Sequence, residues 1–218
     1  SWLEPLIVEF PPHLRPLVTS SLNLSKESVM PAVVLAPVVK NFFFSHLYQL
    51  LGGPEHLPVE YLPTHELSEL LNWNKNQLVS LINFLGLHDL AAEMRSIVDK
   101  NLLKKIYACL GADEFYYLKT CLQQKESLQV PKLGLDFGKQ SRTSLQRILQ
   151  KRGILRLGKA CSGQHPDFIW SLSHIFDIGR GKLLLEASEP IALAKITPLL
   201  KDQLLNLITF LKSTFVKG

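Results

Sequence analysis

The sequence predicts an all-α protein, a single irregular multi-helix domain with a proline-rich, partly extended N-terminal arm. From Glu66 onward, apolar residues recur at intervals of three and four, which is the spacing of one helix face. No long window shows the apolar–polar alternation that is typical of a half-buried strand. Nine of the 13 prolines lie in the first 63 residues, where each removes a backbone donor. We therefore expect the proline-rich arm and one buried helix at 1–65, and a helical domain at 66–218.

The N-terminal part combines turns with one long apolar segment. Residues 1–22 hold prolines at short intervals and are expected to form an extended arm with turns. Residues 32–51 are predicted to form a buried helix, with Pro37 as the point where it can kink. The stretch "GGPEHLPVEYLP" that follows is then a loop.

Capping residues mark the next two helices. Asn74, with Gln77 three residues later, is a variant of the capping box and predicts a helix that begins there. Gly86 is expected to end this helix in a left-handed C-cap, and Asp89 is expected to cap the next one. The apolar face predicted for the first of these helices comprises Leu78, Leu81, Ile82 and Leu85.

Two further helices are predicted after residue 98. Asp99 or Asn101 begins the first of them, and Gly111 ends it. Asp113 and Glu114 open the second, because negative charge is favourable at a helix N-terminus.

Proline marks the starts of the C-terminal helices. Pro166 suits the first position of a helix, and Thr197-Pro198 repeats that signal. The residues expected to face the core are Phe168, Leu172, Ile175 and Phe176 in the first helix, and Leu204, Leu207, Ile208, Leu211 and Phe215 in the second.

One acid-free segment concentrates the positive charge of the chain. Residues 137–166 contain no carboxylate, and the net charge of +5 falls to −2 without the seven basic residues of this segment. A single helix here would return Arg152 and Arg156 to its apolar face, so we expect the helix to break at Gly153. The seven candidate partner-binding residues are Lys139, Arg142, Arg147, Lys151, Arg152, Arg156 and Lys159.

Three interpretations of the basic segment stay open at this point. It can be a solvated surface, a docking surface for an acidic protein, or a contact for nucleic acid. No aromatic residue interleaves the charges, although nucleic-acid grooves usually add exposed aromatics or a recognition helix. A charged docking surface would mainly steer association, and its effect would weaken with added salt.

Motifs for catalysis, cofactors and metals are incomplete. The stretch "GLDFGKQS" has Leu133 and Gln140 where a phosphate-binding loop needs a glycine and a hydroxyl residue. The stretch "DIGRGK" lacks the third glycine of a dinucleotide fingerprint and is interpreted as a turn between helices. In "HELSE", Glu69 replaces the second histidine of a zinc protease. We therefore expect no enzymatic activity, no cofactor, no small-molecule substrate and no metal.

The cysteines and the hydropathy indicate a soluble protein of a reducing compartment. Cys109 and Cys121 lie in apolar helical patterns and Cys161 makes the count odd, so we expect buried free thiols. The most apolar run, at 29–39, falls far short of the ~20 apolar residues of a membrane span. No secretory signal is visible at the N-terminus.

Two stretches carry a family resemblance. "LINFLGLHDLAAEMRSIVDKNLLKKIYACLGADEFYYLKTCL" has a Leu85-Gly86 turn after an apolar helix, and Arg95 close to Ile97 at the end of the next. "DFIWSLSHIFDIGRG" contains a tryptophan and an H-x-x-D-x-GRG element. In this order, over roughly residues 66–185, they resemble the SctK-type accessory subunit of bacterial type III secretion injectisomes. The residues of the second element are His174, Asp177, Gly179, Arg180 and Gly181.

The resemblance implies a cytoplasmic, largely helical adaptor without enzymatic activity, peripheral to the inner membrane. That family belongs to the sorting platform beneath the secretion apparatus, and thus to protein transport and virulence. There it bridges the cytoplasmic domain of an inner-membrane ring protein to the pod protein that carries the ATPase spokes. The alternative hypothesis is a helical protein that binds nucleic acid through the basic segment at 139–159.

Overall fold

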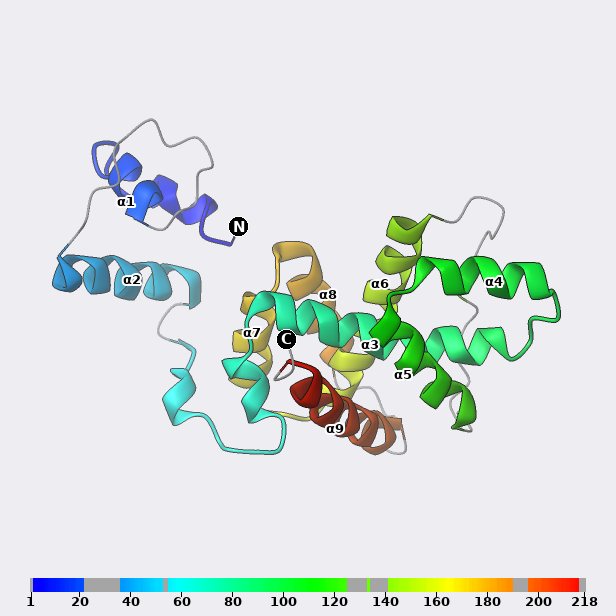
Figure 1. Ribbon diagram of the computed structural model, residues 1–218. Helices are drawn as coiled ribbons and strands as arrows, with labels where there is room; N and C mark the ends of the chain where they lie inside the picture. Colours follow the sequence, from blue (N-terminus) through cyan, green and yellow to red (C-terminus); the bar gives the residue numbers. More distant parts are fainter. Residues whose placement is uncertain are drawn as a thin grey trace. The chain divides into compact units, whose positions relative to one another are not determined.

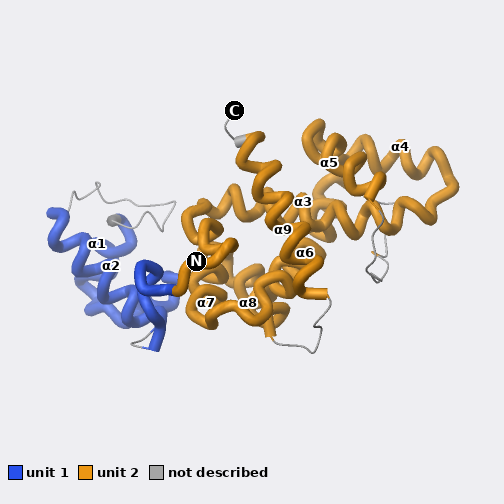
Figure 2. The backbone as a smooth tube through the Cα atoms, turned by 90° about the horizontal axis from the view of Figure 1, so that it is seen from below, with its two compact units in different colours: residues 1–62 blue, residues 63–218 orange. Residues whose placement is uncertain are grey.

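The structure is a computed structural model that describes residues 2–21, 36–52, 55–124, 133, 141–189 and 196–215 (Figure 1). Over these residues every regular element is an α-helix or a short 3₁₀ helix, so the predicted all-α class is confirmed. The chain divides into two compact units, which we call unit 1 (residues 1–62) and unit 2 (residues 63–218) (Figure 2).

Unit 1 consists of the 3₁₀ helix η1 (Pro5–Glu9), α1 (Arg15–Ser21), α2 (Pro37–Gly52) and the 3₁₀ helix η3 (Val59–Tyr61). The segment expected to be an extended arm thus contains η1 and α1. Pro37 occupies the first position of α2, where its fixed φ suits a helix start, so it begins this helix and does not kink it. The preceding part of the predicted helix, at 32–35, lies outside the described residues.

The core of unit 1 is small. Phe10, Val18, Phe43 and Leu47 are buried together, and the rings of Phe10 and Phe43 pack edge to face with centroids 5.8 Å apart. Arg15 ties down the turn before α1 by donating to the carbonyl oxygen of Phe10 at 2.8 Å. Phe43 and Leu47 are the buried residues of α2. The expectation of a buried helix is therefore wrong for most of α2, because this small core covers one narrow face of it.

Unit 2 is organised around two long helices, α3 (Lys75–Met94) and α6 (Arg142–Cys161), which pack against each other. α5 (Ala112–Gln123) packs on α3, whereas α8 (Ile178–Ser188) and α9 (Ile196–Phe215) pack on α6 (Figure 1). The other elements are η4 (Ser68–Asn72), α4 (Lys100–Cys109) and α7 (Pro166–Ile175).

Most of the predicted helix starts are confirmed. Asn74 caps α3 in a complete capping box, in which its side chain accepts from the Gln77 amide at 3.0 Å. Asp99 caps α4, Gly111 lies between α4 and α5, and Pro166 is the first residue of α7. The predicted core residues that are buried are Leu78, Leu81, Ile82, Leu85, Phe168, Leu172, Phe176, Leu204, Leu207, Ile208 and Leu211. Ile175 is half-buried, and the side chain of Phe215 lies outside the described part of the chain.

Two glycines that are predicted to interrupt helices lie inside them instead. Gly86 belongs to α3 and Gly153 belongs to α6. A Cβ atom at Gly86 would lie 2.3 Å from the carbonyl oxygen of Leu149, and one at Gly153 would lie 1.7 Å from that of Ile82. The backbones of α3 and α6 therefore approach so closely that each helix needs a residue without a side chain. Both predicted helix ends are wrong for this reason.

The "DIGRGK" segment is also helical. Asp177 caps α8 by accepting a hydrogen bond from the Arg180 amide at 3.1 Å, and the helix begins at Ile178. The turn predicted here is thus confined to the junction before α8, and Gly179 and Gly181 lie in the first turns of that helix.

Gly153→Ala should lower the free energy of unfolding by about 1–3 kcal/mol, because the added methyl group overpacks the contact with α3. This loss should outweigh the roughly 1 kcal/mol that alanine gains over glycine in a helix. Gly179→Ala in α8 is the matched control, since its Cβ atom would come no closer than 3.5 Å to Asp177 Oδ1. Chemical denaturation compares the two variants. Equal stability would contradict the close approach of α3 and α6.

Candidate functional site

The basic residues of α6 divide between the surface and the interior of unit 2. Arg142, Arg147 and Lys151 are exposed. Arg152 and Lys159 are half-buried, and Arg156 is buried. Lys139, the seventh candidate, lies outside the described residues. The six described candidates therefore do not form one surface.

Arg156 is buried beside a counter-charge on α3. Its Nη2 and Nε atoms lie 2.5 and 2.6 Å from Oδ1 of Asp89, and its Nη1 donates to Oε1 of Gln203 at 2.7 Å. Arg156 is 6% exposed and Asp89 is 4% exposed, so both charges have left bulk water. Because Gln203 belongs to α9, this contact joins α3, α6 and α9.

The ion pair accounts for two incorrect predictions. Asp89 does not cap a helix, since it lies within α3. A continuous α6 does return Arg152 and Arg156 to its inner face. Asp89 compensates for the buried charge of Arg156, whereas Arg152, with Nε 3.8 Å from Asp89 Oδ2, is 20% exposed and keeps contact with water. Isolated buried charges are strongly unfavourable, whereas a hydrogen-bonded pair is tolerated. The helix therefore needs no break at Gly153.

A cavity of about 270 Å³ lies between α3, α5 and α9. His88 Nε2 lies 3.1 Å from the Tyr117 hydroxyl oxygen on its wall, and the rings of Tyr117 and Phe210 pack with centroids 5.0 Å apart. The remaining lining residues are Tyr116, Thr120, Cys121, Gln124, Gln203 and Asn206.

The His88–Tyr117 pair is uncharged near neutral pH. Burial lowers the pKa of His88 to about 3, helped by the guanidinium groups of Arg156 and Arg95. Burial also raises the pKa of the Tyr117 hydroxyl. A general acid or base works best with a pKa near the operating pH. These two groups are therefore suited to packing and hydrogen bonding, and poorly suited to proton transfer.

The three cysteines are free. Cys121 and Cys161 are buried, as predicted, whereas Cys109 is half-buried. Burial raises the pKa of the Cys161 thiol to about 12. Because the thiolate is the reactive form, Cys161 is chemically inert at neutral pH.

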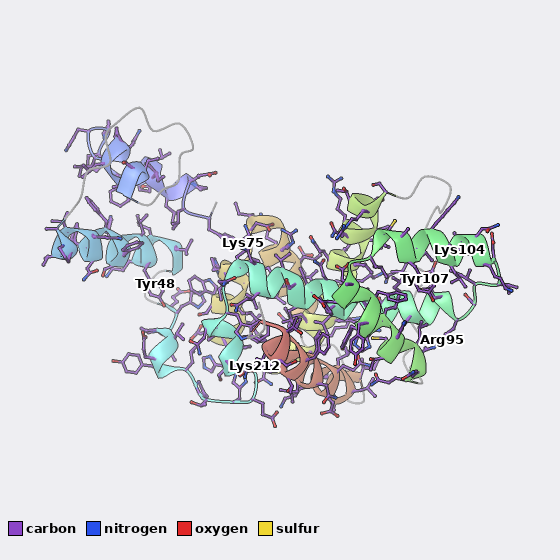
Figure 3. All side chains as sticks on the ribbon, in the orientation of Figure 1. Tyr48, Lys75, Arg95, Lys104, Tyr107 and Lys212 are labelled. Carbon is purple, nitrogen blue, oxygen red and sulfur yellow. The ribbon has the colours of Figure 1, made fainter. Side chains whose placement is uncertain are left out.

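Unit 1 contains an apolar groove of about 580 Å³ along α2. Tyr48, which lies on this helix, donates from its hydroxyl to the carbonyl oxygen of Leu57 at 3.5 Å, and so links α2 to the segment before η3 (Figure 3). The lining residues are Leu3, Phe44, Ser45, Leu47, Tyr48, Gln49, Leu51, Pro58, Val59 and Glu60. Sequence reasoning missed this groove, although the aromatic run "NFFFSHLY" marks its position.

Exposed large hydrophobic side chains gather in unit 1. Among the described residues, Val98 and Tyr116 are the ones that belong to unit 2. Those of unit 1, which we call the apolar surface, are Val8, Val38, Val39, Phe42, Phe44, Tyr48, Leu50, Leu57, Val59 and Tyr61.

The histidine-to-glycine element singled out in the sequence serves local packing. His174 Nδ1 lies 2.7 Å from the carbonyl oxygen of Trp170, whose ring it also contacts. Arg180 pairs with Asp177 and donates to the side chain of Gln150, which ties α8 to α6. Within the described ranges no group of three or more His, Cys, Asp or Glu side chains could hold a metal ion.

Comparisons with known proteins identify no relative. No protein-family model, no curated protein and no solved structure matches the chain. In the part of the chain that the structure describes, none of the helices has both the length and the apolar character needed to cross a bilayer.

Asp89→Asn should lower the free energy of unfolding by about 3–5 kcal/mol, because it leaves the buried Arg156 without its counter-charge. Lys151→Ala, an exposed change on the same helix, should stay within about 0.5 kcal/mol of the parent protein. Urea denaturation monitored by circular dichroism measures both. If Asp89→Asn lowers the free energy of unfolding no more than Lys151→Ala does, the ion pair contributes little to stability.

Stability should decrease as the pH falls from about 6.5 toward 3, because His88 is neutral in the folded state and protonated in the unfolded state over this range. His88→Gln keeps a hydrogen-bonding side chain next to Tyr117 but removes this titration. We therefore expect the variant to lose less stability than the parent between about pH 7 and pH 4. Burial also lowers the pKa of His65, which is present in both proteins and cancels in the comparison. Parallel pH profiles would contradict the buried, neutral His88.

Proposed function

We propose that this protein is a non-enzymatic adaptor that joins two other proteins through two chemically different surfaces. The observation that carries the proposal is the concentration of exposed hydrophobic side chains in unit 1. The second surface is the outward basic face of α6, which we define as Arg147 and Lys151, two exposed residues one helical turn apart.

The apolar surface of unit 1 has the composition of a protein interface. Monomeric proteins expose few contiguous apolar patches, and larger ones usually mark interaction sites. Phe42 is 65% exposed, Phe44 44% and Tyr48 37%, all on one helix. Aromatic residues are enriched in interfaces because they bury a large area at low entropic cost. Phe44 and Tyr48 lie one turn apart on one face of α2, so a partner that packs on this face would remove both side chains from water.

The charges of the two units have opposite signs. Unit 1 carries a net charge of −2 and unit 2 a net charge of +7. Because Arg156 is buried and paired with Asp89, a partner that docks on α6 would contact mainly its outward basic face. Charge of this kind steers association with an acidic partner and selects among partners.

The finer proposal is a place in the sorting platform of a type III secretion system. It rests on the resemblance to the SctK-type subunits, and two dissimilar surfaces on one chain are what a bridging role requires. The partners would be the cytoplasmic domain of the inner-membrane ring protein and the pod protein of the ATPase-spoke assembly. The adaptor would then act in the cytoplasm, held at the inner membrane by these partners.

Arg147→Glu with Lys151→Glu should weaken binding of an acidic partner, and added salt should shrink the difference from the parent. Both residues are exposed, so stability should change by no more than about 0.5 kcal/mol for each. Arg152 is left unchanged because a glutamate there would face the buried Asp89. The matched control is Lys104→Glu with Lys105→Glu, the same change of charge on α4 (Figure 3).

The measurement is co-purification with the ring and pod proteins, followed by affinities at two salt concentrations. Equal loss of binding in both double variants would mean that only net charge matters. Tight binding of a mixed-sequence DNA duplex near physiological salt, lost in the α6 variant, would instead support the nucleic-acid hypothesis.

A further inference from the structure

We infer that the apolar groove of unit 1 binds an amphipathic helix of a partner protein that carries a basic residue beside its apolar face. This inference rests on the proposed adaptor function, because it names the chemistry of one partner at one of the two surfaces.

The floor of the groove is one face of α2. Phe44, Leu47, Tyr48 and Leu51 follow one another at helix positions i, i+3, i+4 and i+7, which places them on the same side. Leu47 is 2% exposed and also belongs to the core of unit 1, so the floor is fixed from beneath. The groove is therefore a preformed feature of the folded unit.

The walls come from two other segments. Leu3, just before η1, contributes to one part of the lining, and Pro58, Val59 and Glu60 contribute another. The Tyr48 hydroxyl oxygen lies 3.5 Å from the Leu57 carbonyl oxygen, which places the segment before the second wall beside α2. Val59 is 45% exposed, so this wall presents its side chain to an incoming partner.

The dimensions favour a helix as the occupant. From Phe44 to Leu51, α2 rises by about 10 Å, which equals roughly two turns of a second helix laid along it. Such a helix inserts apolar side chains at i, i+3 or i+4, and i+7, the spacing used when helices bind in grooves. A peptide that binds by β-strand addition would instead need an exposed strand edge, and the described residues contain no strand.

Charge specifies the occupant further. Among the described residues that line the groove, Glu60 is the one with a carboxylate, and none carries an ammonium group. Lys40 lies outside the lining, with its Nζ 5.7 Å from the centre of the Phe44 ring. A lysine or arginine beside the apolar face of the partner helix would therefore find its counter-charge at Glu60, whereas a glutamate there would be repelled.

The test uses the full chain and two synthetic helical peptides of about 16 residues, long enough to be partly helical in water. Both carry leucines at i, i+3, i+4 and i+7; one has lysines and the other glutamates beside this face. Fluorescence anisotropy gives the affinities. We expect the lysine peptide to bind about tenfold more tightly than the glutamate peptide. A scrambled peptide of the same composition should not bind.

Protein variants locate the binding. Phe44→Ser should weaken binding of the lysine peptide by about tenfold or more, as expected for a buried aromatic anchor. Phe42→Ser is the matched control, because Phe42 is more exposed than Phe44 but does not line the groove. Glu60→Lys should reverse the preference in favour of the glutamate peptide. If circular dichroism shows that Phe44→Ser does not fold, Val59→Ser decides in its place.

The inference is overturned if the peptides bind no better than the scrambled one, or if Phe42→Ser weakens binding as much as Phe44→Ser. It is also overturned if sodium laurate binds the groove and the peptides do not, since the site would then suit a lipid chain. A Phe44→Ser variant that no longer binds the lysine peptide is also tested for capture of the ring and pod proteins. If it still captures them, the groove is not the partner-binding site, and the adaptor function stands. If the parent protein binds the lysine peptide but captures neither partner, the proposed adaptor function is wrong, whereas the peptide-binding groove stands.

Discussion

A guanidinium group that leaves water must keep a counter-charge and fill its hydrogen-bonding positions, because an isolated buried charge is unfavourable by several kcal/mol. Arg156 meets this requirement through Asp89 on α3 and Gln203 on α9. The contact requires α3, α6 and α9 to meet at one point. Gly86 and Gly153 let the backbones of α3 and α6 come close enough for that to happen. α5 then packs on α3, α8 packs on α6, and α7 packs on α8.

The same constraint decides what α6 can offer to a partner. Arg156 on its inner face is held by Asp89, and Arg152 lies at the edge of that contact. Arg147 and Lys151 are exposed and remain available for docking. Unit 1 differs in chemistry, since its small core leaves most of α2 uncovered and its net charge is negative. One chain thus carries a basic surface and an apolar surface, which is the combination that the adaptor proposal uses.

The sequence predicted the helix starts better than the helix ends. Asn74 and Asp99 cap helices as expected, because a cap depends on residues a few positions away. Gly86 and Asp89 carry the same kind of local signal, but their roles depend on α6, which lies more than fifty residues further along the chain. The groove on α2 was missed for a related reason: an apolar run looks buried, and its exposure depends on what the rest of the chain leaves uncovered.

Asp89 and Arg156 stabilise unit 2 as a pair across the crossing of α3 and α6. A double-mutant cycle with Asp89→Leu, Arg156→Met and the combined variant tests this pairing directly, with free energies of unfolding from chemical denaturation. The pairing predicts that the combined variant loses less unfolding free energy than the two single variants lose together, by about 2 kcal/mol or more. The reason is that the combined variant leaves no uncompensated buried charge. Losses that add to within about 0.5 kcal/mol would contradict the claim.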